Sequence, residues 1–168
     1  SRAARDGFDM LDNADLQLGE IEDESGEPLT LTHGNFQSLM QNYDRRMRKD
    51  AFHTYYKAYE SHRFTYSTLL SSSVKKDLFY SRSRNYSGYR AKALFSENIS
   101  EEVYDNLIES VHQNLKPLYK YFEIRKKLLG LDELHAYDCS VPLVKNIKWH
   151  MPYEEAVEKI KIALQPLG

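Results

Sequence analysis

The stretch RRMRKDAFHTYYKAYESHRFTYSTLLSSSVKKDLFYSRSRNY, residues 45–86, contains neither glycine nor proline and decides the fold class. Its apolar and aromatic residues recur mostly three or four positions apart, which is the spacing of one face of an α-helix. This stripe consists of Phe52, Tyr55, Tyr59, Tyr66, Leu69 and Leu70. Three serines at 71–73 have weak helix propensity, so we expect a kink or a break there. The stretch therefore predicts long helices with an aromatic face turned towards a core.

Helical patterns continue beyond this stretch. We expect a long-helix region over 35–95, a helical hairpin over 100–130, and an extended segment followed by a C-terminal helix over 135–168. Ser100 is a good N-cap for the first helix of the hairpin, and the C-terminal helix is expected to start near Pro152. All of these elements belong to one helical segment, residues 1–168.

In residues 14–33 the apolar residues recur with a different spacing, every second position. Leu16 and Leu18, and later Leu29 and Leu31, alternate with polar residues, which is typical of half-buried strands. The sequence DESGEP at 23–28 lies between the two pairs and has the composition of a turn. The segment predicts a β-hairpin, so the expected fold class is mostly α, a multi-helix array with one β-hairpin near the N-terminus.

Composition excludes several classes of protein. The 168 residues are 41% apolar and 29% charged, an ordinary globular balance. The formal net charge of −2 provides no basic field that would by itself recruit nucleic acid. No apolar run reaches the roughly 18 residues of a membrane span. The single cysteine, Cys139, excludes an internal disulfide and fits a reducing compartment.

Motifs for catalysis are missing from the sequence. There is no HExxH, and no two histidines lie four residues apart. Glu109 and His112 form one ExxH pair, whereas di-iron carboxylate bundles need two, so we interpret the pair as part of a helix surface. Cys139 follows His135 by four residues without a cysteine-protease signature, and a small buried thiol is the favoured interpretation. Residues alone thus indicate a mostly α domain without a self-contained active site.

Two basic clusters occur, at 45–49 and at 82–92, and the second is interleaved with tyrosines. Acidic residues lie close to both, so we interpret them as solvated helix faces. A single-strand nucleic-acid binder that uses residues 80–92 stays open as an alternative function.

Several motifs in this order resemble oligoendopeptidase F, a family of zinc metallopeptidases related to thimet oligopeptidase. They are NADL (13–16), LTHGNF (31–36), DRR (44–46), YKAY (56–59), VKKD (74–77), VYDNLI (103–108) and VPLV (141–144). The resemblance covers nearly the whole chain. It departs at Cys139-Ser140, where the family more often has Leu-Tyr.

The resemblance implies a fold and an activity. The chain would be a middle fragment of a cytoplasmic, zinc-dependent peptidase for short peptides, a helical shell around a deep channel. The HExxH zinc helix would lie C-terminal to the matched region. We therefore expect a non-catalytic scaffold or channel-wall fragment with no catalytic residue and no metal ligand, while zinc and peptide substrates belong to the full-length protein. A stand-alone helical binding module without catalysis is the alternative.

Two extended segments are expected to face substrate. They are His33-Gly34 at the end of the hairpin and Tyr137-Asp138, because extended backbone beside a channel can pair with an extended peptide. The alternative is that both segments only pack the junctions between elements. We expect no nucleic-acid or membrane partner. A fragment cut from a larger shell is expected to expose an apolar face and to self-associate through it.

Overall fold

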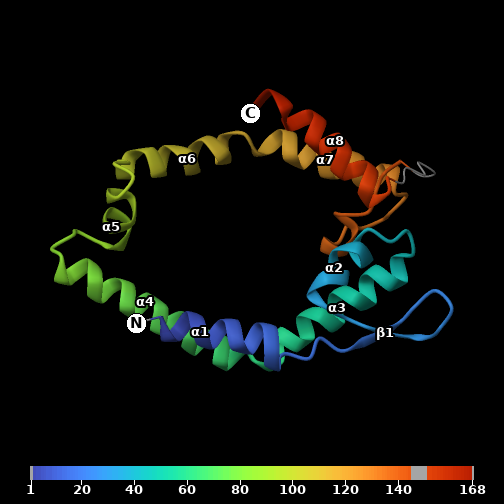
Figure 1. The fold of residues 1–168 in the computed structure, drawn as a ribbon, viewed down its shortest axis with the longest axis horizontal. Helices are drawn as coiled ribbons and strands as arrows, with labels where there is room; N and C mark the ends of the chain where they lie inside the picture. Colours follow the sequence, from blue (N-terminus) through green and yellow to red (C-terminus); the bar gives the residue numbers. More distant parts are fainter. Residues whose placement is uncertain (1, 145–150, 168) are drawn as a thin grey trace.

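The computed structural model describes residues 2–144 and 151–167 and shows a mostly helical chain with one β-hairpin near the N-terminus, which confirms the predicted fold class. The helices are α1 (Ala3–Met10), α2 (His33–Met40), α3 (Arg45–Ser61), α4 (Arg63–Ser83), α5 (Tyr89–Phe95), α6 (Glu101–Gln113), α7 (Leu115–Leu128) and α8 (Tyr153–Leu164). The shorter turns are η1 (Leu11–Asp15), η2 (Ala136–Asp138) and η3 (Gln165–Leu167). Helices α3 to α7 follow one another around an open ring, with α1 beside α4 and α2 beside α3 (Figure 1).

The hairpin is shorter than the predicted span of 14–33. Strands β1 (Glu20–Glu22) and β2 (Pro28–Thr30) pair antiparallel, with Ile21 opposite Leu29. The turn is held by Asp23, whose Oδ1 accepts hydrogen bonds from the backbone N–H groups of Ser25 (2.7 Å) and Glu27 (3.0 Å). The start of the predicted segment is helical instead, because α1 continues into the π-helical turn η1.

The core lies where the hairpin, α2 and α3 meet. Its buried residues are Leu16, Leu18, Ile21, Leu31, Leu39, Met40, Met47, Ala51 and Tyr137. Phe52, Tyr55 and Tyr59 of the predicted stripe pack against this core from α3. Leu70, at the far end of the stripe, is exposed instead.

The predicted break at 71–73 is wrong, because α4 runs through the three serines without interruption. Ser72 Oγ donates to the carbonyl of Thr68 (2.9 Å), so its hydroxyl is satisfied inside the helix. The break falls at His62, the single residue between α3 and α4. There Ser61 Oγ donates to the carbonyl of Ala58 (2.6 Å) at the end of α3.

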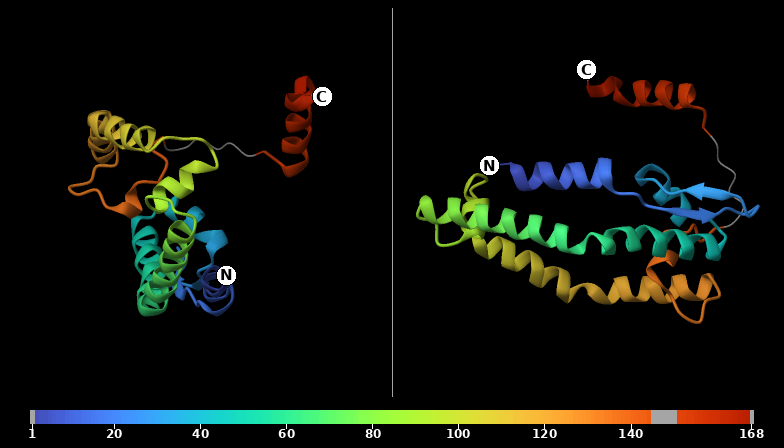
Figure 2. Two further views of the ribbon diagram at one scale, coloured as in Figure 1. Left: turned by 90° about the vertical axis from the view of Figure 1, so that its left-hand side faces the viewer. Right: turned by 90° about the horizontal axis from the view of Figure 1, so that it is seen from below.

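The helical hairpin predicted over 100–130 is also not observed. Helices α6 and α7 continue end to end, separated only by Asn114 (Figure 2). A helical hairpin needs a loop of about two to five residues, which this junction lacks. Pro117 lies in the first turn of α7, where its missing N–H leaves no hydrogen bond unmade. The C-terminal helix is confirmed, since α8 begins after Pro152, whereas residues 145–150 of the expected extended segment lie outside the described residues.

The surface of the chain is large for its mass. The accessible area is 13252 Å², whereas a compact monomer of 19.7 kDa exposes about 8600 Å². Helices α6 and α8 contain no buried residue. None of the described helices has the length and apolarity needed to cross a membrane. Much apolar helix surface is therefore uncovered in this chain.

Candidate functional site

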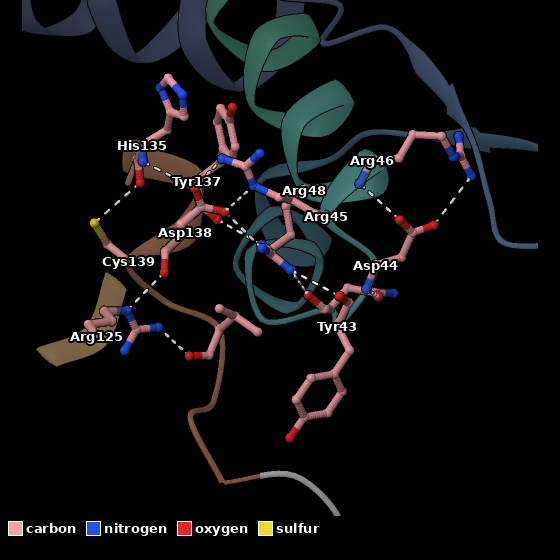
Figure 3. A network of polar contacts seen from close by, with 12 residues as sticks. Tyr43, Asp44, Arg45, Arg46, Arg48, Arg125, His135, Tyr137, Asp138 and Cys139 are labelled. Carbon is pink, nitrogen blue, oxygen red and sulfur yellow. Dashed lines mark hydrogen bonds and ion pairs between the residues drawn. The ribbon is translucent and has the colours of Figure 1, made fainter. Parts of the chain in front are cut away.

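The best-defined polar site is a buried carboxylate surrounded by arginines. Asp138, in η2, has no exposed surface. Arg45 donates to it through two nitrogens, Nε to Oδ1 (3.0 Å) and Nη2 to Oδ2 (2.8 Å). Arg48 Nη2 donates to Oδ1 (2.8 Å), and the backbone N–H of His135 donates to Oδ2 (3.1 Å). Together with Arg125, these residues form the network that we call the Asp138 clamp (Figure 3).

The arginines keep Asp138 ionised. Burial acts to raise the pKa of Asp138, but the hydrogen bonds from Arg45 and Arg48 outweigh it and lower the pKa to about 2. The same pairing raises the pKa of Arg45. The carboxylate of Asp138 and the guanidinium of Arg45 therefore stay charged near neutral pH, and the charge-assisted hydrogen bonds between them are of the strong kind.

All three clamp arginines also bind backbone, and Arg45 does so by donating from Nη2 to the carbonyl of Glu133 (3.3 Å). Arg48 Nε donates to the carbonyl of Tyr137 (2.9 Å), and its Nη1 donates to the carbonyl of Asn42 (2.8 Å). Arg125 Nε donates to the carbonyl of Asp138 (2.8 Å), and its Nη2 donates to the carbonyl of Val141. Because Arg48 lies on α3 and Arg125 on α7, the clamp joins the two ends of the helical ring (Figures 1 and 3).

A row of aromatic rings runs along α3 between the two predicted substrate-facing segments. Its members are His33, Phe36, Phe52, Tyr55, Tyr56, His135 and Tyr137, and we call it the aromatic row. Phe36 stacks on Tyr55 with 3.9 Å between ring centroids. At the other end Phe52 meets Tyr137 edge-on at 5.9 Å. A continuous series of ring contacts thus connects α2 with η2.

His33 is held at the N-terminal end of this row. Its Nδ1 lies 2.9 Å from Tyr55 Oη, and its Nε2 lies 3.1 Å from the carbonyl oxygen of Asp12. The π-turn frees that carbonyl, since the N–H of Leu16 bonds to Leu11 instead. Asp12 Oδ1 accepts hydrogen bonds from Tyr59 (2.8 Å) and Tyr66 (3.2 Å).

The phenols beside Asp12 are hard to ionise. Burial is the main cause that raises the pKa of Tyr66 to about 12, and the negative charge of Asp12 adds to it. Burial also raises the pKa of Tyr59 strongly, followed by its hydrogen bonds to Tyr55 and Asp12. An open pocket of about 370 Å³ lies beside Asp12 and His33. The cluster offers hydrogen-bond donors and acceptors, but no activated nucleophile.

The structure corrects the conformation expected for both predicted segments. His33 and Gly34 form the first turn of α2, because Thr32 Oγ1 accepts from Asn35 N (3.1 Å) and caps the helix. Both residues are exposed. Tyr137 and Asp138 form the 3₁₀ turn η2 and are buried. A role for any of the four in facing substrate stays a prediction.

The clamp arginines cannot be recognised from the sequence pattern. Arg45 and Arg48 were part of a basic cluster that we interpreted as a solvated face, yet Arg48 is buried. In the second basic cluster, Arg90 donates to Glu101 (2.5 Å) and Asp105 (2.7 Å) of α6. No signal in the sequence separates the two clusters, because their carboxylate partners lie on other elements.

The residues considered for metal or thiol chemistry do not assemble a site. Within 2–144 and 151–167, no group of three or more His, Cys, Asp or Glu could hold a metal ion, so these residues do not fit a zinc site. Glu109 accepts from Gln113 (2.9 Å), in keeping with the helix-surface interpretation. Cys139 is half-buried, and its Sγ lies 3.5 Å from the carbonyl oxygen of His135.

Comparison with known proteins defines the class to which this fold belongs. Residues 38–165 match peptidase family M3, and the chain belongs to that family. It is 44% identical over 161 residues to oligopeptidase PepF of Bacillus subtilis, a match that covers 96% of this chain and 24% of that protein. An oligoendopeptidase F homolog of Lactococcus lactis is 39% identical over 161 residues, a match that covers 96% of this chain and 27% of that protein.

A solved structure agrees with these sequence matches. The crystal structure of oligoendopeptidase-F from Enterococcus faecium superposes with a TM-score of 0.83 at 39% identity, covering 99% of this chain and 31% of that one. The resemblance to oligoendopeptidase F is therefore confirmed. The chain spans about a quarter of the length of the curated relatives that it matches.

Proposed function

We propose that this chain is a non-catalytic wall segment of an oligoendopeptidase F-like zinc metallopeptidase that hydrolyses short peptides in the cytoplasm. The observation that carries the proposal is its membership of peptidase family M3 while it spans about a quarter of its relatives' length. The described residues do not fit a zinc site, so we derive no catalytic step through them. Zinc and the groups that activate water would come from other parts of the full-length enzyme.

The Asp138 clamp supports a structural role. A general acid or base needs to come within hydrogen-bond reach of its substrate. Asp138 has no exposed surface, and both of its carboxylate oxygens already accept hydrogen bonds from within the chain. This arrangement suits a residue that fixes the ring of helices.

Substrate contact is proposed at the exposed end of the aromatic row. His33 and Gly34 face solvent beside the pocket at η1. Tyr137 and Asp138 would act on substrate only by positioning, because their side chains are buried. Tyr137 would fix the C-terminal end of the row through its contact with Phe52.

The test uses the full-length enzyme and a short quenched-fluorescent peptide. We expect His33→Gln to raise KM several-fold with kcat nearly unchanged, since the imidazole is removed from a binding surface and not from the reacting atoms. Tyr137→Ala should also raise KM, by loosening the row. His112→Gln, on exposed α6, is the matched control and should change neither constant.

Each part of the proposal can fail separately. Unchanged KM and kcat in both His33→Gln and Tyr137→Ala would refute the substrate-facing assignment. A full-length, zinc-loaded protein that hydrolyses no short peptide would refute the peptidase assignment and leave the helical binding module.

A further inference from the structure

The pocket beside Asp12 and His33 lies in a strongly acidic part of the chain. Residues 6–44 contain ten aspartates or glutamates and neither lysine nor arginine, although the whole chain has a net charge of −2. The pocket, of about 370 Å³, is bounded by η1, by the start of β1 and by the end of β2. Ligand sites typically have volumes of about 300–1000 Å³. We call this cavity the η1 pocket.

Asp12 supplies a mostly buried carboxylate to the η1 pocket. Its side chain is 18% exposed, and its Oδ1 accepts hydrogen bonds from the phenols of Tyr59 and Tyr66. Its Oδ2 lies 3.8 Å from His33 Nε2, beyond hydrogen-bond distance, and that nitrogen is closer to the carbonyl oxygen of Asp12, at 3.1 Å. A buried charge normally has an opposite charge beside it. In the described part of the chain, no lysine or arginine forms an ion pair with Asp12, so Oδ2 is available to a ligand.

Two further features make the pocket more negative. Glu20 lines it from the first residue of β1, where its Oε1 accepts a hydrogen bond from Thr30 Oγ1 (3.0 Å). The pocket also lies at the C-terminal end of the helix formed by α1 and η1, where the macrodipole is negative and the last carbonyls have no partner within the helix. Neither lysine nor arginine is among the described residues that line the pocket. The η1 pocket is therefore complementary to a cation that donates several hydrogen bonds.

We propose that the η1 pocket binds an ammonium or guanidinium group of a basic peptide substrate. The inference rests on the proposed function, in which His33 at this pocket contacts short peptides, and it adds the substrate class. An ammonium has three N–H donors and a guanidinium five, which suit the carboxylates of Asp12 and Glu20. The acidic segment 6–44 attracts the same peptides over a longer distance, which favours their encounter with the pocket.

The experiment measures KM of the full-length enzyme for pairs of short quenched-fluorescent peptides. The two peptides of a pair differ at one position, which holds either lysine or norleucine, an uncharged side chain of similar length. Successive pairs place this position along the peptide, and one further pair compares a free with an acetylated N-terminus. We define the cation preference as the KM of the uncharged peptide divided by the KM of the charged one. In one pair it should be about 10 with kcat nearly unchanged, the effect of one charge-assisted hydrogen bond.

The pair that shows the preference identifies the source of the cation. A preference in a lysine pair assigns the pocket to a basic side chain, whereas a preference in the acetylated pair assigns it to the terminal amine. Either result supports the proposal, because the pocket recognises the same chemical group.

Substitutions then test whether the pocket is responsible. Asp12→Asn should abolish the cation preference. Glu20→Gln should reduce it about threefold, because Glu20 is exposed, and its amide oxygen can still accept from Thr30. Glu22→Gln is the matched control, since Glu22 is exposed on the same face of β1 but does not line the pocket, and it should leave the preference unchanged. The preference compares two peptides on one protein, so a general loss of activity cancels. If Asp12→Asn does not fold, Glu20→Gln carries the comparison.

Other outcomes would overturn the inference. Equal KM values within every pair, with normal hydrolysis, would exclude the cation site and leave the proposed function intact. Equal losses of preference in Glu20→Gln and Glu22→Gln would assign it to the general field of the acidic segment and not to the pocket. If the full-length enzyme hydrolyses none of the peptides, the proposed function fails. Fluorescence anisotropy with singly labelled peptides then decides the inference alone, since tighter binding of a charged peptide supports it and equal binding within every pair refutes it.

Discussion

Replacing Asp138 with asparagine tests whether the clamp holds the ring of helices together. The substitution keeps the shape of the side chain but removes the charge that Arg45 and Arg48 bind. Asparagine also presents an NH₂ group where a carboxylate oxygen accepts a hydrogen bond. Arg48, which is itself buried, is then left without its anion.

The magnitude follows from the pKa of Asp138. Its fall from 3.8 to about 2 corresponds to about 2 kcal/mol of stabilisation of the charged form in the folded state. Breaking a buried ion pair by removing one partner costs about 3–5 kcal/mol, because the remaining charge stays buried. We therefore expect Asp138→Asn to destabilise the clamp by about 3 kcal/mol, which is roughly a 100-fold change in a local opening equilibrium.

Native-state hydrogen exchange in the full-length enzyme measures this local opening. The informative amides are those of Asp138 and Cys139, which donate to the carbonyls of His135 (2.9 Å) and Ala136 (3.1 Å). Asp50→Asn is the matched control, because Asp50 lies on α3 in an exposed ion pair with Arg46 (3.5 Å). Such a pair contributes at most about 1 kcal/mol.

The pH dependence has a definite sign. The folded-state pKa of Asp138 lies below its unfolded value, so its contribution is complete above pH 3.8 and is lost as pH falls towards about 2. Wild type and Asp138→Asn should differ at neutral pH and converge over that acidic interval. Exchange in Asp138→Asn that is no faster than in Asp50→Asn would refute the reasoning.

Three further predictions concern the N-terminal half, each measured in the full-length enzyme. Gly19→Ala should lower the free energy of unfolding by about 2 kcal/mol in a denaturant titration, because φ is +87° and the new Cβ would lie 2.9 Å from Thr54 Cγ2. Gly26→Ala, the control, has a similar φ but open space around the new Cβ, and should lower it by about 1 kcal/mol. Equal effects of the two substitutions would contradict this reasoning. Thr32→Ala should cost about 1 kcal/mol and speed exchange in the first turn of α2, because the capping box is lost; unchanged exchange would count against the cap. Tyr66→Phe should remove a phenol that ionises near pH 12 from an alkaline absorbance titration, and loss of one ionising near the ordinary value of 10 would contradict its placement beside Asp12.

Local pattern was enough to predict the helices and the hairpin. The spacing of Phe52, Tyr55 and Tyr59 reports a helix face directly, and these side chains do pack on the core. The sequence pattern did not correctly predict where one helix ends and the next begins, because such a junction depends on a few local hydrogen bonds. The serines at 71–73 stay helical, and a single residue, Asn114, leads from α6 into α7 where a hairpin was expected.

The clamp could not be predicted, because its partners are far apart in sequence. Arg45 and Arg48 meet Asp138 across 93 and 90 residues. Their spacing on α3 is equally typical of a solvated helix face, as the exposed ion pairs of Arg46 show. Arg125 likewise begins a basic run, residues 125–127, in which Lys127 is exposed. Only the tertiary fold distinguishes buried arginines from exposed ones of the same pattern.

The long sequence separation of the clamp also determines when it forms during folding. Helices α3 to α7 are local structures, whereas the clamp needs both ends of the ring to meet, and such non-local contacts form slowly. We infer that ring closure follows the folding transition state. A weakened clamp would then leave the folding rate nearly unchanged and accelerate unfolding instead. The lifetime of the folded ring, more than the speed at which it assembles, would therefore be set by one carboxylate.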